Sequence, residues 1–147
     1  MHVQIRSEAF NPYEEMGRYQ AGLEARGAIG AAASFIGTLR DRNEGAVVSE
    51  MQLEHYPGMT ERHLQAICSE AVSRWALIDC LVLHRCGLIH VGETIVLVAT
   101  WAARRGEAMD ACRFIIEDLK AKAPFWKKER LEGGERWVEK NTSGYSN

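Results

Sequence analysis

The chain has 147 residues, of which 46% are hydrophobic and 26% charged, as expected of one soluble globular domain with a single core. Its formal net charge is −2, which argues against a general binder of nucleic acid or other polyanions. No apolar run reaches the length of a membrane span, and the first ten residues lack the apolar stretch of a signal peptide. We therefore expect neither nucleic acid nor membrane as a partner.

Four cysteines occur, at positions 68, 80, 86 and 112. None belongs to a Cys-x-x-Cys pair, and no group of histidines and cysteines has the spacing of zinc ligands. Each lies in an apolar stretch, where a free cysteine behaves as a small hydrophobic residue. We expect reduced, buried thiols in a cytoplasmic protein that uses neither a metal nor a cofactor.

Hydrophobic periodicity and turn residues predict the elements of the first half of the chain. Asn11-Pro12 supplies an N-cap followed by proline at the first helical position. The run 27–40 is rich in glycine and alanine, and its glycines favour a tightly packed strand over a helix. The expected elements are a strand over 2–10, a helix from Pro12 to about Leu23, a strand within 27–40, a loop over 41–45 and a half-buried strand over 46–56.

The second half contains longer elements. Thr60 is the expected N-cap of a helix that reaches about Trp75, and Pro124 ends the most regular helix of the chain. Apolar runs predict two well-covered strands, joined through glycine turns at 86–87 and 91–92. The expected elements are a helix over 60–75, strands over 77–85 and 94–101, a helix over 105–122, a β-hairpin over 125–139 and a disordered tail over 141–147.

This order of elements predicts an α+β fold with one domain over residues 1–140, a mixed or antiparallel sheet, packed helices and a C-terminal β-hairpin. No Walker loop, GxGxxG, HExxH or GxSxG motif occurs. Any chemistry should therefore depend on arginine and lysine. All five lysines lie in the C-terminal fifth of the chain, which indicates either a solvated basic face or a local anion site.

Two arginines, Arg104 and Arg105, stand at the start of the long predicted helix. A helix N-terminus presents unpaired N–H groups and the positive end of the dipole, so cations are unfavourable there unless an anion binds. The helix end and the guanidinium groups would then hold the anion together. The alternative is two solvated arginines in the preceding loop, and the residues alone favour that alternative.

Lys120 lies near the end of the same helix, and Lys127 follows Pro124. A lysine that is partly out of water and near other cations has a lowered pKa and can act as a nucleophile or proton carrier. The alternatives are a helix-terminal cation for Lys120 and, for Lys127, a side chain lying over the neighbouring aromatic residues. The residues alone favour the structural role for Lys120 and leave Lys127 open.

Arg40 and the His84-Arg85 pair each mark the end of a predicted strand. Arg40 opens the polar loop after 35–39, a position well placed to line a pocket, although a surface arginine is the default. His84 and Arg85 are predicted to be structural, a hydrogen-bonded histidine and a paired arginine.

Several segments, in order, resemble the large, catalytic subunit of the molybdopterin synthase family. The resemblance covers about residues 28 to 139. Its most specific parts are the P-F-W-K-K-E block at 124–129 and the R-W-V-E block at 136–139. The other matching segments are 30–31, 35–40, 53–59, Trp75, 84–87, 91–93, 119–123 and 134–135.

The resemblance implies an α/β-hammerhead-like fold and a sulfur-transfer reaction. In this family, two sulfurs are added to cyclic pyranopterin monophosphate, which forms the dithiolene of molybdopterin. The sulfur comes from the C-terminal thiocarboxylate of a small ubiquitin-like subunit, whose tail enters a pocket on the large subunit. Two large subunits pair as a homodimer with a small subunit at each end, which gives a heterotetramer.

The resemblance also implies roles for single residues. Lys120 and Lys127 match the catalytic lysines, and Phe35 matches an aromatic residue of the pocket. The implied substrate-binding residues are Arg40, Arg104, Arg105 and Arg136. The family commonly has histidine where this chain has Arg104, so either that histidine is not the essential proton carrier or Arg104 changes the pH behaviour of the site. Lys140 is a candidate basic residue for the neighbouring site.

Two other classes of function remain open at this stage. The chain could be a noncatalytic binding module that uses its basic C-terminal segment to hold the acidic tail of a partner. It could also be a different lysine enzyme, one that forms a Schiff base with a carbonyl substrate.

Overall fold

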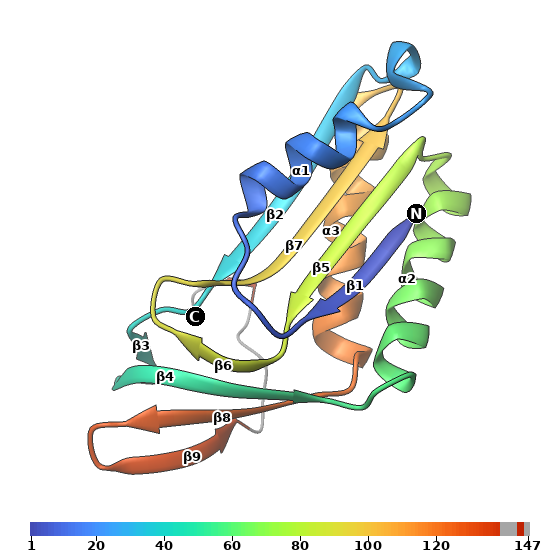
Figure 1. The fold of residues 1–147 in the computed structure, drawn as a ribbon. Coiled ribbons are helices and arrows are strands. Elements are labelled where there is room, and N and C mark those ends of the chain that lie inside the picture. Colours follow the sequence, from blue (N-terminus) through green and yellow to red (C-terminus); the bar gives the residue numbers. More distant parts are fainter. Residues whose placement is uncertain (139–143, 146–147) are drawn as a thin grey trace.

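The structure, a computed structural model, describes residues 1–138, 144 and 145, which form two β-sheets and three α-helices (Figure 1). The α+β class predicted from the sequence is confirmed. Lys140 and most of the predicted tail 141–147 lie outside the described residues. No helix in the described part of the chain is long and apolar enough to cross a bilayer.

The elements have the following bounds. They are β1 (His2–Arg6), α1 (Pro12–Ala21), a short 3-10 helix (Arg26–Ala28), β2 (Ala31–Thr38), β3 (Arg42–Asn43), β4 (Ala46–His55), α2 (Met59–Trp75), β5 (Asp79–Arg85), β6 (Gly87–His90), β7 (Thr94–Ala102), α3 (Arg105–Lys122), β8 (Phe125–Leu131) and β9 (Gly134–Val138).

The four-stranded sheet has the strand order β1-β5-β7-β2. β1 runs parallel to β5, whereas the β5–β7 and β7–β2 pairs are antiparallel, so the sheet is mixed. β5 and β7 are the two apolar runs that we expected to be covered, and nearly all of their residues are buried. α2 and α3 cover one face of this sheet, and α1 lies on the other (Figure 1).

α3 has the bounds that its sequence predicts, and its apolar face, which includes Ala108, Ala111, Ile115 and Leu119, is buried against the sheet and α2. Its N-cap residue, Arg104, is extended and makes no capping hydrogen bond through its side chain. The helix ends just before Pro124, whose ring cannot continue it. α3 runs back along β7 and therefore parallel to β2, so its last turn lies beside the end of β2.

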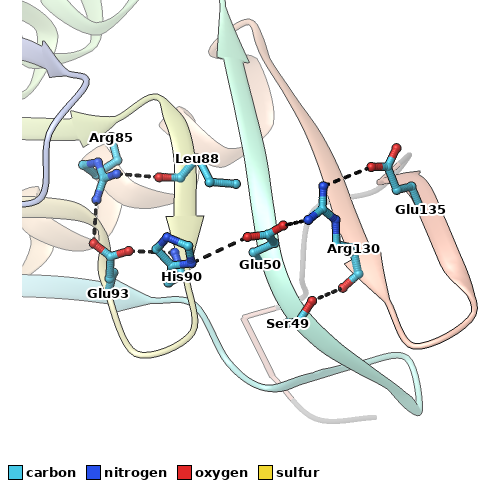
Figure 2. A network of polar contacts seen from close by, with 8 residues as sticks. All are labelled: Ser49, Glu50, Arg85, Leu88, His90, Glu93, Arg130 and Glu135. Atoms are coloured by element: carbon cyan, nitrogen blue, oxygen red, sulfur yellow. Dashed lines mark hydrogen bonds and ion pairs between the residues drawn. The ribbon is translucent and has the colours of Figure 1, made fainter.

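The second sheet has the order β3-β4-β8-β9, with β6 also paired to β4. One face carries an apolar cluster that includes Val48, Met51, Leu53 and Ile89. Glu50 alternates with Met51 and so belongs to the other face. Figure 2 shows Glu50 between His90 of β6 and Arg130 of β8, while Arg130 also reaches Glu135 of β9. These polar contacts join four neighbouring strands.

Several boundaries differ from those predicted. β1 ends at Arg6 rather than at residue 10, and α2 is capped by Gly58, so Thr60 lies inside the helix. The predicted loop 41–45 contains β3, and the predicted turn at 86–87 opens into β6; both strands pair with β4. Strands this short show no hydrophobic period, so pairing with β4 decides their conformation.

Gly30 marks a very close backbone approach at the start of β2. Its N–H donates to the carbonyl oxygen of Ala102 at 3.0 Å. A Cβ at this position would lie 2.0 Å from the carbonyl oxygen of Ala103. Glycine therefore lets the start of β2 lie against the link between β7 and α3.

Gly30→Ala is expected to destabilise the protein, because the added methyl group meets backbone that cannot move alone. Overpacking of this kind costs about 1–3 kcal/mol of the free energy of unfolding. Urea denaturation measures it. Gly27→Ala is the matched control, because a Cβ at Gly27 meets nothing within 4 Å. Equal stability of the two variants would show that the close approach does not matter.

Candidate active site

A pocket of about 430 Å³ lies where the end of β2, the last turns of α3 and the inner face of the second sheet meet. Its walls combine apolar residues from both sheets with charged side chains. Phe35 of β2, the predicted aromatic lining residue, is 38% exposed and lies against Gly37. The charged lining residues are Arg40, Arg42, Arg113, Glu117, Lys120, Lys127 and Glu129. A concave apolar pocket with a few convergent charged groups is the first place to seek an active site.

The two predicted catalytic lysines meet inside this pocket. Lys120 comes from the last turn of α3, and Lys127 comes from β8. Lys127 shares its face of β8 with Phe125 and Glu129, because alternate residues of a strand point the same way. The two amino groups lie within hydrogen-bonding reach of each other. The structure thus brings together two residues that the sequence separates by a proline.

Both lysines have lowered pKa values. Burial lowers the pKa of Lys127 to about 7, the neighbouring Lys120 lowers it too, and Glu129 acts in the opposite direction. Burial also lowers the pKa of Lys120, an effect that its hydrogen bond with Lys127 partly offsets. Near neutral pH, a substantial fraction of the Lys127 side chains are therefore neutral amines.

Glu129 closes the pocket beside the lysines. It is 3% exposed, and its Oε1 accepts a hydrogen bond from Nδ2 of Asn43 at 2.6 Å. Its Oε2 lies 3.5 Å from Nη2 of Arg136, which donates to the carbonyl oxygen of Asn43 at 2.9 Å. Arg136 therefore lies behind the pocket wall as a counter-ion of Glu129 and does not line the pocket. Its implied contact with substrate stays a prediction.

Arginine side chains line the exposed part of the pocket. Arg40, the predicted substrate-binding residue after β2, is exposed and lines it, and so does Arg42 of β3. Arg113 of α3 pairs with Glu117 at 2.9 Å and donates to the Tyr145 hydroxyl at 3.1 Å. Guanidinium groups bind phosphate and carboxylate well, so an anion can be held at this entrance.

Sequence analysis missed four of the charged lining residues, which are Arg42, Arg113, Glu117 and Glu129. Arg42 stands in a polar segment and Arg113 on an exposed helix face, where residue type and spacing do not separate a pocket from a surface. Glu129 had a detectable signal, because it follows Lys127 by two residues in a predicted strand and so shares its face. In the part of the chain that the structure describes, no group of His, Cys, Asp and Glu side chains could hold a metal ion.

Arg104 and Arg105 do not reach this pocket within one chain. They are exposed at the opposite end of α3. Arg105 precedes Lys120 by 15 residues (120 − 105), which corresponds to about 23 Å along a helix that rises 1.5 Å per residue. Any joint role with the lysines therefore needs a second copy of the chain.

The fold and the pocket define a class: an α+β enzyme subunit with paired, half-buried lysine amines and arginines placed for an anion. The sequence profile described as "MoaE protein" matches residues 6–122, and the chain belongs to this family. A Ralstonia nicotianae protein named molybdopterin synthase catalytic subunit is 51% identical over 137 residues, which is 93% of this chain and 76% of the relative. The family resemblance drawn from the sequence is confirmed.

Solved structures share the fold. A molybdopterin biosynthesis MoaE protein from Burkholderia ambifaria matches with a TM-score of 0.78 and 43% identity, over 97% of this chain and 92% of that one. A complex of subunits 1 and 2 of the molybdopterin-converting factor from Helicobacter pylori matches with a TM-score of 0.78, over 93% of this chain and 90% of that one. At 20% identity, this second likeness concerns the fold alone.

Lys127→Met is expected to stabilise the protein at neutral pH. Between a folded pKa of about 7 and an unfolded value of about 10.4, the unfolded chain binds more protons, so the stability of the natural protein rises with pH in this window. Burial of Lys127 therefore destabilises most at pH 7 and below. Urea denaturation should show a gain on the order of 1 kcal/mol or more at pH 7 that shrinks at pH 10.

Lys122→Met is the matched control for this measurement. Lys122 is exposed and donates to Asp118 at 3.0 Å, so its removal should give no pH-dependent gain. If the gain from Lys127→Met did not change between pH 7 and pH 10, Lys127 would not be a neutral amine in the folded protein.

Proposed function

We propose that this chain is the catalytic subunit of a molybdopterin synthase. It transfers sulfur from the C-terminal thiocarboxylate of a small ubiquitin-like carrier protein to cyclic pyranopterin monophosphate, and the product carries the dithiolene of molybdopterin. The observation that carries the proposal is the half-buried lysine pair in a pocket with exposed arginines. The relatives named molybdopterin synthase catalytic subunit support the same reaction.

The charges of the pocket suit both reactants. The pterin precursor carries a phosphate, which the guanidinium groups of Arg40 and Arg42 would bind. The tail of the carrier protein is an anion, which the positive charge of Lys120 attracts. Phe35 offers an apolar surface at the same entrance for the pterin ring.

The lysine pair then assists transfer of the acyl group to water. After the thiocarboxylate sulfur has displaced an oxygen substituent from a carbon of the pterin precursor, with that oxygen keeping its bonding electrons, the acyl carbon of the carrier is still joined to the sulfur. Water attacks this carbon, the neutral amine of Lys127 takes a proton from the water, and the Lys120 ammonium stabilises the oxyanion. The acyl–sulfur bond breaks, the carrier leaves as a carboxylate, and the sulfur keeps the bonding electrons and stays on the pterin.

A small carrier subunit is the proposed protein partner. Both amines lie half-buried inside the pocket, where an extended C-terminal tail can reach them more readily than a flat globular surface can. The Helicobacter pylori complex joins the two subunits of a molybdopterin-converting factor, and we propose the same kind of pairing here. The cytoplasm is the proposed location, because buried free thiols such as Cys68 and Cys80 persist in a reducing compartment.

A second copy of the chain is the proposed source of Arg104 and Arg105, within a homodimer that carries two carrier subunits. β2 is an edge strand: among the described residues it pairs with β7 alone. It is uncharged and rich in small residues, and such an edge is open to pairing with another strand. Two β2 strands that pair antiparallel about a twofold axis bring the start of each beside the end of the other. Since α3 is parallel to β2, Arg104 and Arg105 of one copy would then approach the pocket of the other.

Lys120→Ala and Lys127→Ala are each expected to lower product formation by about 100-fold or more, because positioned proton transfer contributes that much to a rate. The assay mixes the protein with thiocarboxylated carrier and cyclic precursor, and mass spectrometry counts the sulfurs added to the pterin. Binding of the carrier, measured by calorimetry, should persist. Lys122→Ala is the control and should keep full activity.

The sulfur-transfer assay and a borohydride trapping experiment separate the competing classes of function. A binding module would hold the carrier tail but add no sulfur even with the natural sequence. A Schiff-base enzyme would be trapped on a lysine by borohydride in the presence of its carbonyl substrate, an adduct that the proposed reaction does not form. Full activity of both alanine variants would rule out the catalytic assignment.

Mixing two inactive variants tests the shared site. Arg105→Ala and Lys127→Ala damage the same pocket from different copies, so a mixed dimer retains one intact pocket. Random exchange makes half of the dimers mixed, and activity should return to about a quarter of the natural level. Lys120→Ala mixed with Lys127→Ala is the control, because each pocket then lacks one lysine. Absence of recovery in a sample that contains mixed dimers would contradict the proposal.

A further inference from the structure

The relative position of the two lysines is not set by either element that carries them. Lys120 is in the last turn of α3 and Lys127 near the start of β8, and the chain changes direction between them at residues 123–125, here called the α3–β8 corner. Pro124 has no N–H group, so no helical or sheet hydrogen bond continues through it. The alignment of the amines therefore depends on what holds this corner.

Thr60 holds the α3–β8 corner from the side of α2. It is fully buried in the first turn of that helix. Its Oγ1 donates to the carbonyl oxygen of Pro124 at 3.0 Å and accepts the N–H of Tyr56 at 2.9 Å. The N–H of Thr60 in turn donates to the carbonyl oxygen of Tyr56 at 2.9 Å. One hydroxyl thus joins the end of β4, the start of α2 and the corner.

His84 holds the corner from the side of the first sheet. It is 1% exposed near the end of β5, and its ring stacks on Phe125 with 3.9 Å between centroids and 17° between planes. Its Nδ1 lies 2.8 Å from the carbonyl oxygen of Arg85. A carbonyl oxygen only accepts, so Nδ1 carries the hydrogen and the rotation of the ring is fixed. Phe125 is the first residue of β8 and shares its face with Lys127.

His84 in the stack with Phe125 stays uncharged throughout the working pH range. Burial lowers the pKa of His84 to about 3, and Lys120, Lys127 and His55 contribute in the same direction. Lys120 faces it from α3, Lys127 from β8 and His55 from β4. A neutral imidazole at this place adds no third positive charge behind the two amines.

We propose that Thr60 and His84 are positioning residues for the lysine pair: together they clamp the α3–β8 corner and so set the separation of the two amines and their exclusion from water. Both were outside the sequence-based list of site residues, and His84 was predicted to be only structural. The link to turnover rests on the proposed function, whereas the reactivity of the Lys127 amine can be measured without any substrate.

Loosening the corner should raise the pKa of Lys127. Water then reaches the amines and the distance between them grows, which weakens the two main causes of the low value. A rise of about one unit from 7 lowers the neutral fraction of Lys127 at pH 7 from about half to about a tenth, which is about a five-fold loss of reactivity. The loss should vanish near pH 10, where the amine is neutral in either case.

Thr60→Val and His84→Leu test the clamp, the first because it keeps the shape of the side chain and removes only the hydroxyl. Each variant is acetylated with acetic anhydride from pH 6 to pH 10, and mass spectrometry follows Lys127 with exposed Lys122 as internal reference. The midpoint of the Lys127 profile should move up by about one pH unit in both variants. Thr60→Ser restores the hydroxyl and should return the midpoint to that of the natural protein.

Thr100→Val is the matched control. Thr100 is also fully buried, and its Oγ1 donates to the carbonyl oxygen of Ala108 at 2.7 Å, at the far end of α3. It should lower the unfolding midpoint as Thr60→Val does but leave the Lys127 profile in place. The proposal is overturned if Thr60→Val leaves that profile in place, or if Thr100→Val moves it equally.

The two proposals fail in different ways. If the natural protein adds no sulfur to the pterin, the proposed function fails while the acetylation profiles still report on the clamp. If sulfur is added but the profiles do not move, the clamp fails alone. When both hold, Thr60→Val should lose about five-fold in product formation at pH 7 and recover it toward pH 9.

Discussion

Two lysine amines lie side by side in a pocket that excludes much of the water. The side chains around the pocket hold the two amines in this position. Each amine loses hydration, and the two charges repel, so both effects favour the neutral form. Glu129 limits the effect on Lys127 from one side. That carboxylate is itself buried and is held by Asn43 and Arg136. Glu129, Asn43 and Arg136, together with the apolar core beyond them, thus hold Lys127 in an unfavourable environment.

The sequence alone predicted the elements whose residues show a clear period. α3 has its predicted bounds, and the hairpin of β8 and β9 lies where a glycine pair separates two runs. β3 and β6 could not be predicted in the same way, because they are short and owe their conformation to pairing with β4. Gly58 in place of Thr60 as the cap of α2 has a comparable cause: the Thr60 hydroxyl binds Tyr56 and Pro124 and is not available to the helix end.

The site was predictable only in part, for a related reason. The residues alone favoured a helix-terminal cation for Lys120, and it was the family resemblance that assigned it to catalysis. Its surroundings come from the second sheet, which places Lys127 and Glu129 of β8 beside the end of α3. No local pattern in α3 reports that contact. Arg136 illustrates the reverse case. The family resemblance implied that it binds substrate, whereas its neighbours in the structure are Glu129 and Asn43.

In a single chain, the arginines at the start of α3 lie far from the lysine pocket and the edge of β2 is open to another strand. One partner chain would answer both features. Arg104 and Arg105 stand at the positive end of a helix dipole, where an anion is needed to offset their charge. Among the strands that the structure describes, β2 pairs only with β7 and so presents an open edge at the same side of the sheet. The proposed second copy would cover the edge of β2, and the phosphate of the proposed substrate would offset the charge of the arginines. This chain has Arg104 where the family commonly has histidine, so the proposed site lacks an imidazole at that position, and Lys127 would then set its response near neutral pH.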